Sequence, residues 1–156
     1  MVYAQRMLAC VSPDYCGGVV SVPRAWRQAK TGKWQDRFVD PSAARLIRFD
    51  IDQRRKITPA AAMKKREAAL RGTSGLRILG RATDTLTTAR GGKVAVATLV
   101  YSYRSGGTTR WVANRFVSLY GIPDQAVEIT VAGRLTDRAV LTTTLAKATR
   151  TFTLVG

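Results

Sequence analysis

The sequence contains no histidine, only two cysteines and only ten acidic residues among its 156 positions. Histidine is the commonest general base and the commonest metal ligand in proteins, so its absence excludes most familiar catalytic and metal-binding arrangements. No apolar run approaches the roughly 18 residues that a membrane-spanning helix needs. We therefore predict a chain that is not an enzyme, binds no cofactor and has no transmembrane segment.

What the chain does contain is enough apolar sequence for a folded core. Hydrophobic residues make up 46% of the 156 positions, and proline is limited to five. This composition argues against disorder despite a net charge of +16. The length suits a single domain with a sizeable core.

The positive charge is spread over the whole chain. Residues 1–75 carry 15 basic and 6 acidic side chains, and residues 76–156 carry 11 and 4, which gives net charges of +9 and +7. Arginine outnumbers lysine by 19 to 7, a bias typical of a GC-rich genome. Most of the positive charge therefore reflects the base composition of the genome. As a secondary effect, it attracts anionic partners.

Two local clusters exceed that background and define a candidate anion-binding patch. Its residues are Arg54, Arg55, Lys56, Lys64, Lys65 and Arg66. An ordinary solvated face is the favoured interpretation, and a phosphate-binding site is the alternative. No aromatic residue lies within or between the clusters, and no helix-turn-helix, zinc-finger or RNP pattern occurs. Nucleic-acid binding is therefore supported by electrostatics alone.

Two aspartates precede the first of these clusters. Asp50 and Asp52 lie two residues apart on a predicted strand, so they share a face, and arginines surround them at positions 48, 54 and 55. A pair of carboxylates can hold a hard metal ion. The neighbouring guanidinium groups make ion pairs the preferred prediction.

Cys10 and Cys16 enclose five residues that include Pro13 and Asp14, a turn-prone loop that a disulfide could close. The spacing fits neither a redox motif nor a zinc site. A disulfide requires an oxidising compartment, and two free thiols in a cytosolic protein are the alternative. We expect residues 1–16 to be an N-terminal segment, either the remnant of a longer precursor or a disulfide loop, followed by a single domain over residues 17–156.

Alternating and short apolar segments predict a largely β domain. The expected strands cover residues 19–22, 34–39, 45–51, 76–85, 93–103, 109–120 and 125–132, with a last extended segment over residues 151–155. In the strand over residues 45–51, Ile47, Phe49 and Ile51 share one face. Both faces of the strand over residues 93–103 are largely apolar, which predicts a central strand covered on both sides by helices.

Two helices are expected beside the strands. Thr58 is typical of an N-cap and Pro59 of a first helical position, so a helix is predicted to run to Leu70, with Ala60, Met63 and Leu70 on its buried face. A second helix is predicted from about Asp137. Its apolar residues recur with helical spacing and form one stripe: Leu141, Leu145, Ala148 and Phe152.

Trp26 and Trp111 are the aromatic residues with a candidate role in binding. Packing in the core is the favoured interpretation of both. A ligand groove that they line, with arginine neighbours, is the alternative.

The segment from Gly18 to Trp26, which reads G-V-V-S-V-P-R-A-W, resembles the opening of PsbP-like domains. These domains occur in actinobacterial envelope lipoproteins of the LpqN type and in extracytoplasmic regions attached to serine/threonine kinases. The segment Phe38 to Ser42, F-V-D-P-S, is similar to the hairpin that follows in such sequences. The later hairpin over residues 101–115, the final predicted helix and Thr151-Phe152 are similar in order and spacing.

The resemblance covers residues 17–156 and implies a fold, a role and a location. The fold is α+β, with an antiparallel sheet of about six to seven strands flanked by helices in an α/β/α sandwich. The family shares no catalytic residues, so the implied role is that of an accessory, sensing or binding domain. The implied location is the cell envelope, whereas the absence of an export signal in residues 1–9 makes the cytoplasm the alternative.

Two functions follow from these observations. The first is a non-catalytic domain of the bacterial cell envelope that binds a protein partner, an anionic envelope polymer or a lipid headgroup. The second is a basic protein that associates with nucleic acid through charge alone.

Overall fold

The structure of the protein is a computed structural model, and it describes residues 1–155. In chain order the elements are β1 (Tyr3–Leu8), β2 (Gly18–Pro23), β3 (Arg27–Gly32), β4 (Gln35–Val39), β5 (Leu46–Asp50), α1 (Pro59–Ala69), β6 (Arg77–Thr87), β7 (Lys93–Ser105), β8 (Thr108–Leu119), β9 (Ile122–Arg134), the single 3-10 turn η1 (Leu135–Asp137), α2 (Arg138–Thr151) and β10 (Thr153–Leu154).

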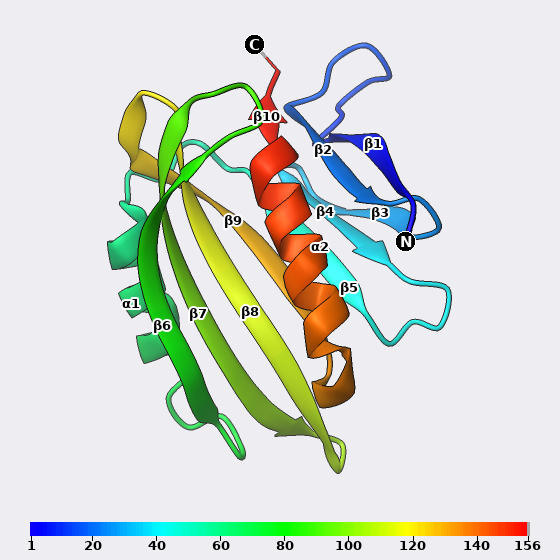
Figure 1. The fold of residues 1–156 in the computed structure, drawn as a ribbon, viewed down its shortest axis with the longest axis vertical. Helices are drawn as coiled ribbons and strands as arrows, with labels where there is room; N and C mark the ends of the chain where they lie inside the picture. Colours follow the sequence, from blue (N-terminus) through cyan, green and yellow to red (C-terminus); the bar gives the residue numbers. More distant parts are fainter. Residues whose placement is uncertain (156) are drawn as a thin grey trace.

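The strands of the described chain form two antiparallel sheets. The large sheet has seven strands in the order β3-β4-β5-β9-β8-β7-β6, and the small sheet has the order β1-β2-β10. Figure 1 shows α2 crossing one face of the large sheet while α1 lies against the other face. The predicted α+β class, an antiparallel sheet flanked by helices, is confirmed. The small sheet was not predicted, because short strands from distant parts of the sequence build it.

The core has two parts, one on each face of the large sheet. Strand β7 contributes Val94 and Val96 to the part beneath α2, and Ala97 and Leu99 to the part beneath α1. The prediction is therefore right that both faces of this strand are covered, but it is wrong about its place in the sheet, because β7 lies beside the edge strand β6. Helix α1 packs directly on β7, whereas α2 packs mainly on β9. Alternation along a strand sends neighbouring side chains to opposite faces, so two apolar faces require two covering layers.

Helix α1 begins as its sequence predicts. Thr58 is the N-cap, and its hydroxyl accepts a hydrogen bond of 3.2 Å from the amide of Ala61. The buried face differs from the prediction, because the helix buries Ala62 and Met63 and leaves Ala60 exposed. Leu70 is half-buried at the end of the helix.

Helix α2 buries the predicted stripe. Leu141, Leu145, Ala148 and Phe152 are all buried in the part of the core beneath α2. The helix packs on β9 of the large sheet and on β2 of the small sheet. It therefore links the two sheets through one apolar surface.

The N-terminal segment differs most from the prediction. Strand β1 pairs with β2 along its whole length, from Tyr3 opposite Pro23 to Leu8 opposite Gly18. Leu8 and Ala9 are buried in the same core as α2. Residues 3–9 thus belong to the domain that was predicted to begin at residue 17, and only the loop after them is a separate feature. Neither helix of the described residues has the length and apolar character that crossing a membrane would require.

Candidate functional site

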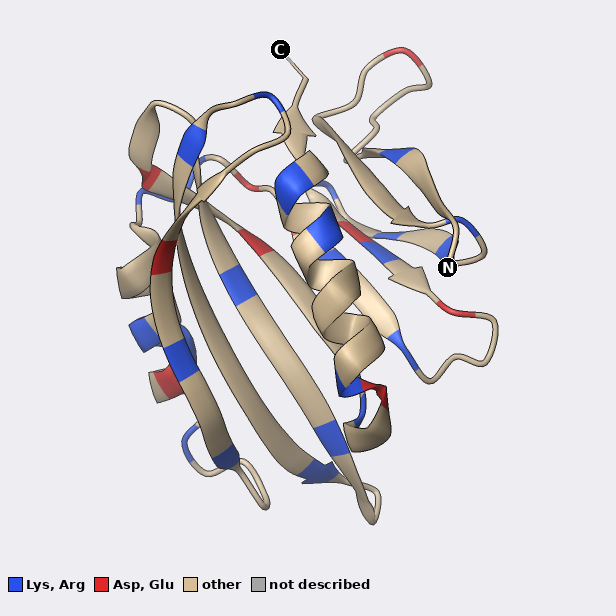
Figure 2. Cartoon of the chain, in the orientation of Figure 1, with Lys and Arg blue, Asp and Glu red and all other residues tan. Residues whose placement is uncertain are grey.

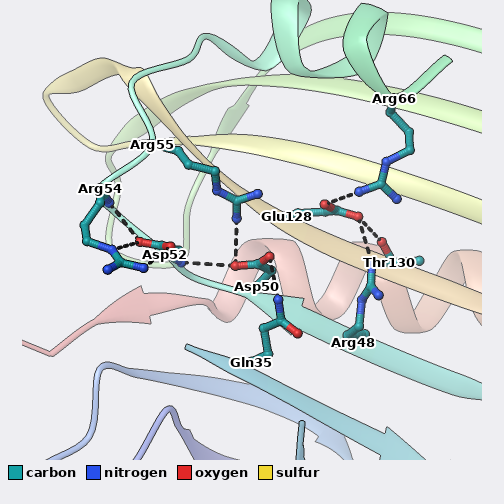
Figure 3. Close-up of polar contacts among 9 residues, drawn as sticks. All are labelled: Gln35, Arg48, Asp50, Asp52, Arg54, Arg55, Arg66, Glu128 and Thr130. Carbon is teal, nitrogen blue, oxygen red and sulfur yellow. Dashed lines mark hydrogen bonds and ion pairs between the residues drawn. The ribbon is translucent and has the colours of Figure 1, made fainter. Parts of the chain in front are cut away.

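The six residues of the predicted anion-binding patch do not act as one free positive surface. Arg54 pairs with Asp52 at 2.8 Å, Arg55 with Asp50 at 2.7 Å and Arg66 with Glu128 at 2.7 Å (Figure 3). The predicted ion pairing of the two aspartates is therefore present, with Arg54 and Arg55 as partners. A single patch of six free cations is therefore not present, because its three arginines form ion pairs with carboxylates of the same chain.

The three lysines of that patch remain exposed. Lys56, Lys64 and Lys65 take part in none of the ion pairs found among residues 1–155. Figure 2 shows basic residues on α1, on α2 and along several strands. The positive charge is dispersed, as the sequence indicates.

The two candidate groove aromatics are core residues. Trp26 is 4% exposed and Trp111 is 5% exposed, and both belong to the part of the core beneath α2. The groove interpretation is therefore wrong, and the packing interpretation describes both side chains. A large aromatic ring buries more apolar area than any other side chain, which favours such positions.

The cysteine loop closes on itself. The sulfur atoms of Cys10 and Cys16 are joined in a disulfide at 2.02 Å. Within the loop, the amide of Val11 donates a hydrogen bond to the carbonyl of Tyr15 at 3.0 Å. The carbonyl of Cys10 also accepts a hydrogen bond of 2.7 Å from Lys30, which attaches the loop to β3.

A hollow lined by arginines lies on the face of the large sheet that α1 only partly covers. We call it the arginine pocket, and its volume is about 380 Å³. Five strands, the end of β3 and helix α1 contribute its lining: Thr31, Gln35, Arg37, Leu46, Arg48, Arg66, Tyr101, Tyr103, Arg110, Val112, Asn114, Thr130 and Ala132.

The strand register explains why these side chains meet. Arg48 on β5 lies opposite Thr130 on β9, and Thr130 lies opposite Asn114 on β8. Residues that face each other across antiparallel strands point to the same side of the sheet. This row therefore forms a continuous polar band across the sheet. Arg66 reaches the same band from α1 (Figure 3).

A buried carboxylate anchors one side of the pocket. The side chain of Glu128 is 4% exposed, and it contacts Arg66 at 2.7 Å and Arg48 at 3.3 Å. Thr130 donates to it at 2.8 Å, and the amide nitrogen of Asn114 donates at 3.4 Å. A buried charge is tolerated only when it is paired and hydrogen-bonded, and these contacts provide both.

The pocket nevertheless keeps an excess of positive charge. Four arginines line it, and two of them, Arg48 and Arg66, contact Glu128. Arg37 and Arg110 belong to none of the ion pairs of residues 1–155. Arg37 also lies directly opposite Arg48 across β4 and β5. Like charges that face each other across a sheet are unfavourable, so this pair gains from an added anion.

Two tyrosines form the neutral wall of the pocket. The ring centroids of Tyr101 and Tyr103 are 6.2 Å apart, with their planes inclined at 34°. Burial raises the pKa of the Tyr101 phenol above its ordinary value, outweighing the opposing effect of the nearby Arg66 charge. The phenol therefore stays protonated and does not reduce the positive charge of the pocket.

A second hollow lies elsewhere on the molecule and has a different character. It has a volume of about 530 Å³, and Arg90, Tyr120, Ile122, Phe152 and Leu154 are among its lining residues. Its surface is mainly apolar, with one arginine as its charged group. Although it is larger, it lacks the converging charged side chains that make the arginine pocket a candidate site.

Of the four pocket arginines, the sequence pattern predicts only Arg66 as a site residue. It does so because Arg66 belongs to a local basic cluster, and not because it lies near a pocket. One signal could have led to the pocket, namely Glu128 and Thr130 within the apolar segment from Ala126 to Ala132. Polar residues at alternate positions of a buried strand indicate a polar face. No group of three or more potential metal-ligating side chains occurs within residues 1–155.

Comparison with known proteins gives the fold a context. No protein-family model matches the chain, and no curated protein sequence matches it. The Ran-binding protein Mog1p of Saccharomyces cerevisiae has a similar structure, with a TM-score of 0.64, 13% identity, and coverage of 99% of this chain and 96% of that one. LpqN of Mycobacterium tuberculosis, described as involved in cell envelope biogenesis, has a TM-score of 0.53, 17% identity, and coverage of 99% and 92%. The architecture therefore matches a PsbP/Mog1-like fold.

Proposed function

We propose that this protein is a non-catalytic binding domain of the bacterial cell envelope, and that its arginine pocket holds an anionic group of an envelope component. The observation that carries the proposal is the charge of the pocket. Arg37 faces Arg48 across the sheet, Arg66 and Arg110 line the same hollow, and one buried carboxylate, Glu128, balances only part of this charge. Guanidinium groups bind phosphate and carboxylate groups through paired hydrogen bonds.

The shared fold adds support by analogy for a binding role. One similar structure is that of a protein described as Ran-binding, and another is described as involved in cell envelope biogenesis. A protein partner that presents an acidic or phosphorylated group would use the same pocket as an anionic polymer or lipid.

The Cys10–Cys16 disulfide supports a location outside the cytoplasm, because such bonds persist in oxidising compartments. Labelling of unfolded, unreduced protein from its native source with a thiol reagent tests this part of the proposal. We expect both cysteines to remain unlabelled until a reductant is added. Complete labelling without reductant would show free thiols and place the protein in a reducing compartment.

The pocket itself is tested by titration with inorganic phosphate, followed by NMR or calorimetry. We expect the double variant Arg37→Gln/Arg110→Gln to bind phosphate at least about tenfold more weakly, because two charge-assisted contacts are lost. The matched control is Arg27→Gln/Arg77→Gln, which removes the same charge from exposed positions outside the pocket. We expect the control to bind as the wild type does.

Equal losses in both double variants would overturn the proposal, because net charge and not the pocket would then govern binding. The same variants also separate the pocket from the nucleic-acid alternative. The test is binding to DNA or RNA at about 50 mM salt. The nucleic-acid alternative would be favoured if the pocket variant still binds and a variant with Lys56, Lys64 and Lys65 substituted binds more weakly.

A further inference from the structure

We infer that the ligand of the arginine pocket is a sugar or polyol that carries a phosphate group, and not a bare anion. The inference rests on the proposed function, since it names the ligand of the same pocket. Three features of the lining carry it. They are a buried amide oxygen without a hydrogen-bond donor, an aromatic wall, and two arginines without a carboxylate partner.

The amide oxygen belongs to Asn114 in the middle of β8. This residue is fully buried and lines the base of the pocket. Its nitrogen donates to Thr130 at 2.8 Å and to Glu128 at 3.4 Å, whereas its Oδ1 atom has no partner within residues 1–155. Nearly all buried polar atoms in proteins are hydrogen-bonded. A buried acceptor without a partner, on a residue that lines the pocket, calls for a donor, and a hydroxyl group of a ligand that reaches it supplies one.

Two of the four pocket arginines form no ion pair among residues 1–155. Arg37 is on β4 and Arg110 is at the start of β8, and neither has a carboxylate partner among residues 1–155. A phosphate monoester carries close to two negative charges near neutral pH, which suits two such groups. Glu128 pairs with the other two arginines, so Arg37 and Arg110 carry the charge that remains for the phosphate.

Part of the lining between the charged groups is apolar or aromatic. Tyr101 and Tyr103 form one wall, and Leu46, Val112 and Ala132 contribute apolar surface beside the polar lining residues. A phosphate ion would leave most of the roughly 380 Å³ to water, whereas this volume lies in the range of small-molecule sites, about 300–1,000 Å³. The C–H faces of a sugar ring pack on aromatic side chains while its hydroxyl groups reach the polar base.

The test compares ligands of equal charge on the whole, disulfide-bonded protein. Glucose 6-phosphate, glucose 1-phosphate and glycerol 3-phosphate provide hydroxyl groups, and ethyl phosphate is the matched ligand without them. We expect at least one of the three to bind five- to tenfold more tightly than ethyl phosphate, the gain of about one or two hydrogen bonds. Glucose, which lacks the charge, should not bind measurably.

Variants identify the groups responsible. Asn114→Leu removes the unpaired acceptor, so we expect the affinity for the hydroxylated ligands, divided by that for ethyl phosphate, to fall to about one. Thr130→Val, which alters the same hydrogen-bond network but keeps the acceptor, should keep the preference. The readout is the affinity for the hydroxylated phosphate divided by the affinity for ethyl phosphate. A general loss of structure would lower both affinities and leave this ratio unchanged.

The possible outcomes separate this inference from the proposed function. Equal binding of ethyl phosphate and all three hydroxylated phosphates overturns the inference and leaves the anion site in place. Absence of binding by every phosphate overturns both. Competition by phosphatidylglycerol vesicles, with phosphatidylcholine vesicles as control, would assign the polyol phosphate to a lipid headgroup, and lack of competition would assign it to a soluble or polymeric sugar phosphate.

Discussion

At the scale of single residues, the pair Arg37 and Arg48 is the most informative. The two arginines face each other across β4 and β5, a position where sheets favour apolar or oppositely charged pairs. Arg48 is partly balanced by Glu128 at 3.3 Å, and Arg37 has no such partner among residues 1–155. The arrangement costs stability in the free protein and favours the bound anion.

Replacing Arg37 by glutamine should therefore have opposite effects on folding and binding. We expect Arg37→Gln to raise the free energy of unfolding by about 0.5 kcal/mol without ligand, because the like-charge contact is removed. The same substitution should weaken phosphate binding. Urea unfolding and calorimetric titration measure the two effects. Arg27→Gln is the control, since Arg27 lies opposite Val39 and should change neither quantity.

Asp52 gives a prediction for the dependence of stability on pH. The hydrogen bond from the Arg54 side chain, 2.8 Å from Nε to Oδ1, lowers the pKa of Asp52 from its ordinary value of 3.8 to about 2. A pKa that is lower in the folded state means that this contact stabilises the protein fully above pH 3.8. Its contribution is lost as the pH falls from there toward about 2.

Urea unfolding at pH 6 and in steps down to pH 2 measures this effect. We expect Asp52→Asn to be less stable than the wild type at pH 6 and to approach it at the acid end, because the contact is then lost in both. Asp124→Asn, at an exposed position without an ion pair among residues 1–155, is the control. A constant gap between Asp52→Asn and wild type at all pH values would contradict the assignment.

At the scale of elements, α1 shows which signals are local. A threonine N-cap followed by proline fixes where the helix begins, and this depends only on adjacent residues. The buried face depends on where the helix lies on β7 and β8, so Ala60 is exposed although its spacing from Met63 favours burial. The same placement brings Arg66 to Glu128.

The cap of α1 can be tested on its own. Thr58→Ala removes the acceptor for the amide of Ala61, so we expect the free energy of unfolding to fall by about 1 kcal/mol. Thr58→Ser keeps an acceptor and should lose only a small part of this. Circular dichroism during urea unfolding measures both. Equal losses in the two variants would mean that the methyl group of Thr58, and not its hydroxyl, stabilises the helix.

Strands differ in how strongly their sequences predict them. Ile47, Phe49 and Ile51 were predicted to share a face and are all buried, because alternation is a local signal of a half-buried strand. Strand β3, Arg27–Gly32, has no such alternation and is exposed along its whole length. It is an edge strand whose pairing with β4 holds it in place. Pairing of that kind leaves no pattern in the strand's own sequence.

At the scale of the whole molecule, distant segments complete one core. Strand β2 pairs with β1 from the N-terminus on one side and with β10 from the C-terminal region on the other (Figure 1). Helix α2 packs against this small sheet and against β9. The N-terminal residues are therefore part of the domain and contribute to its stability.

Substitutions in β1 test this integration. Leu8 is fully buried, so Leu8→Ala should lower the free energy of unfolding by about 2–5 kcal/mol. Its neighbour Met7 is 42% exposed, and Met7→Ala should change the value by less than about 0.5 kcal/mol. Chemical unfolding of both variants beside the wild type measures the difference. Two small and equal effects would instead indicate a dispensable N-terminal segment.

The sequence by itself determined the class of fold, the two helices, the covering of both faces of β7 and the absence of histidine-based chemistry, because each depends on local patterns or on composition. It also indicated ion pairs for Asp50 and Asp52, whose partners lie within five residues. The sequence also favoured the core positions that Trp26 and Trp111 occupy. Tertiary structure alone decided that Arg37, Arg48, Arg66 and Arg110 line one pocket. Those residues come from four elements, and only the register of distant strands and the seating of α1 bring them together.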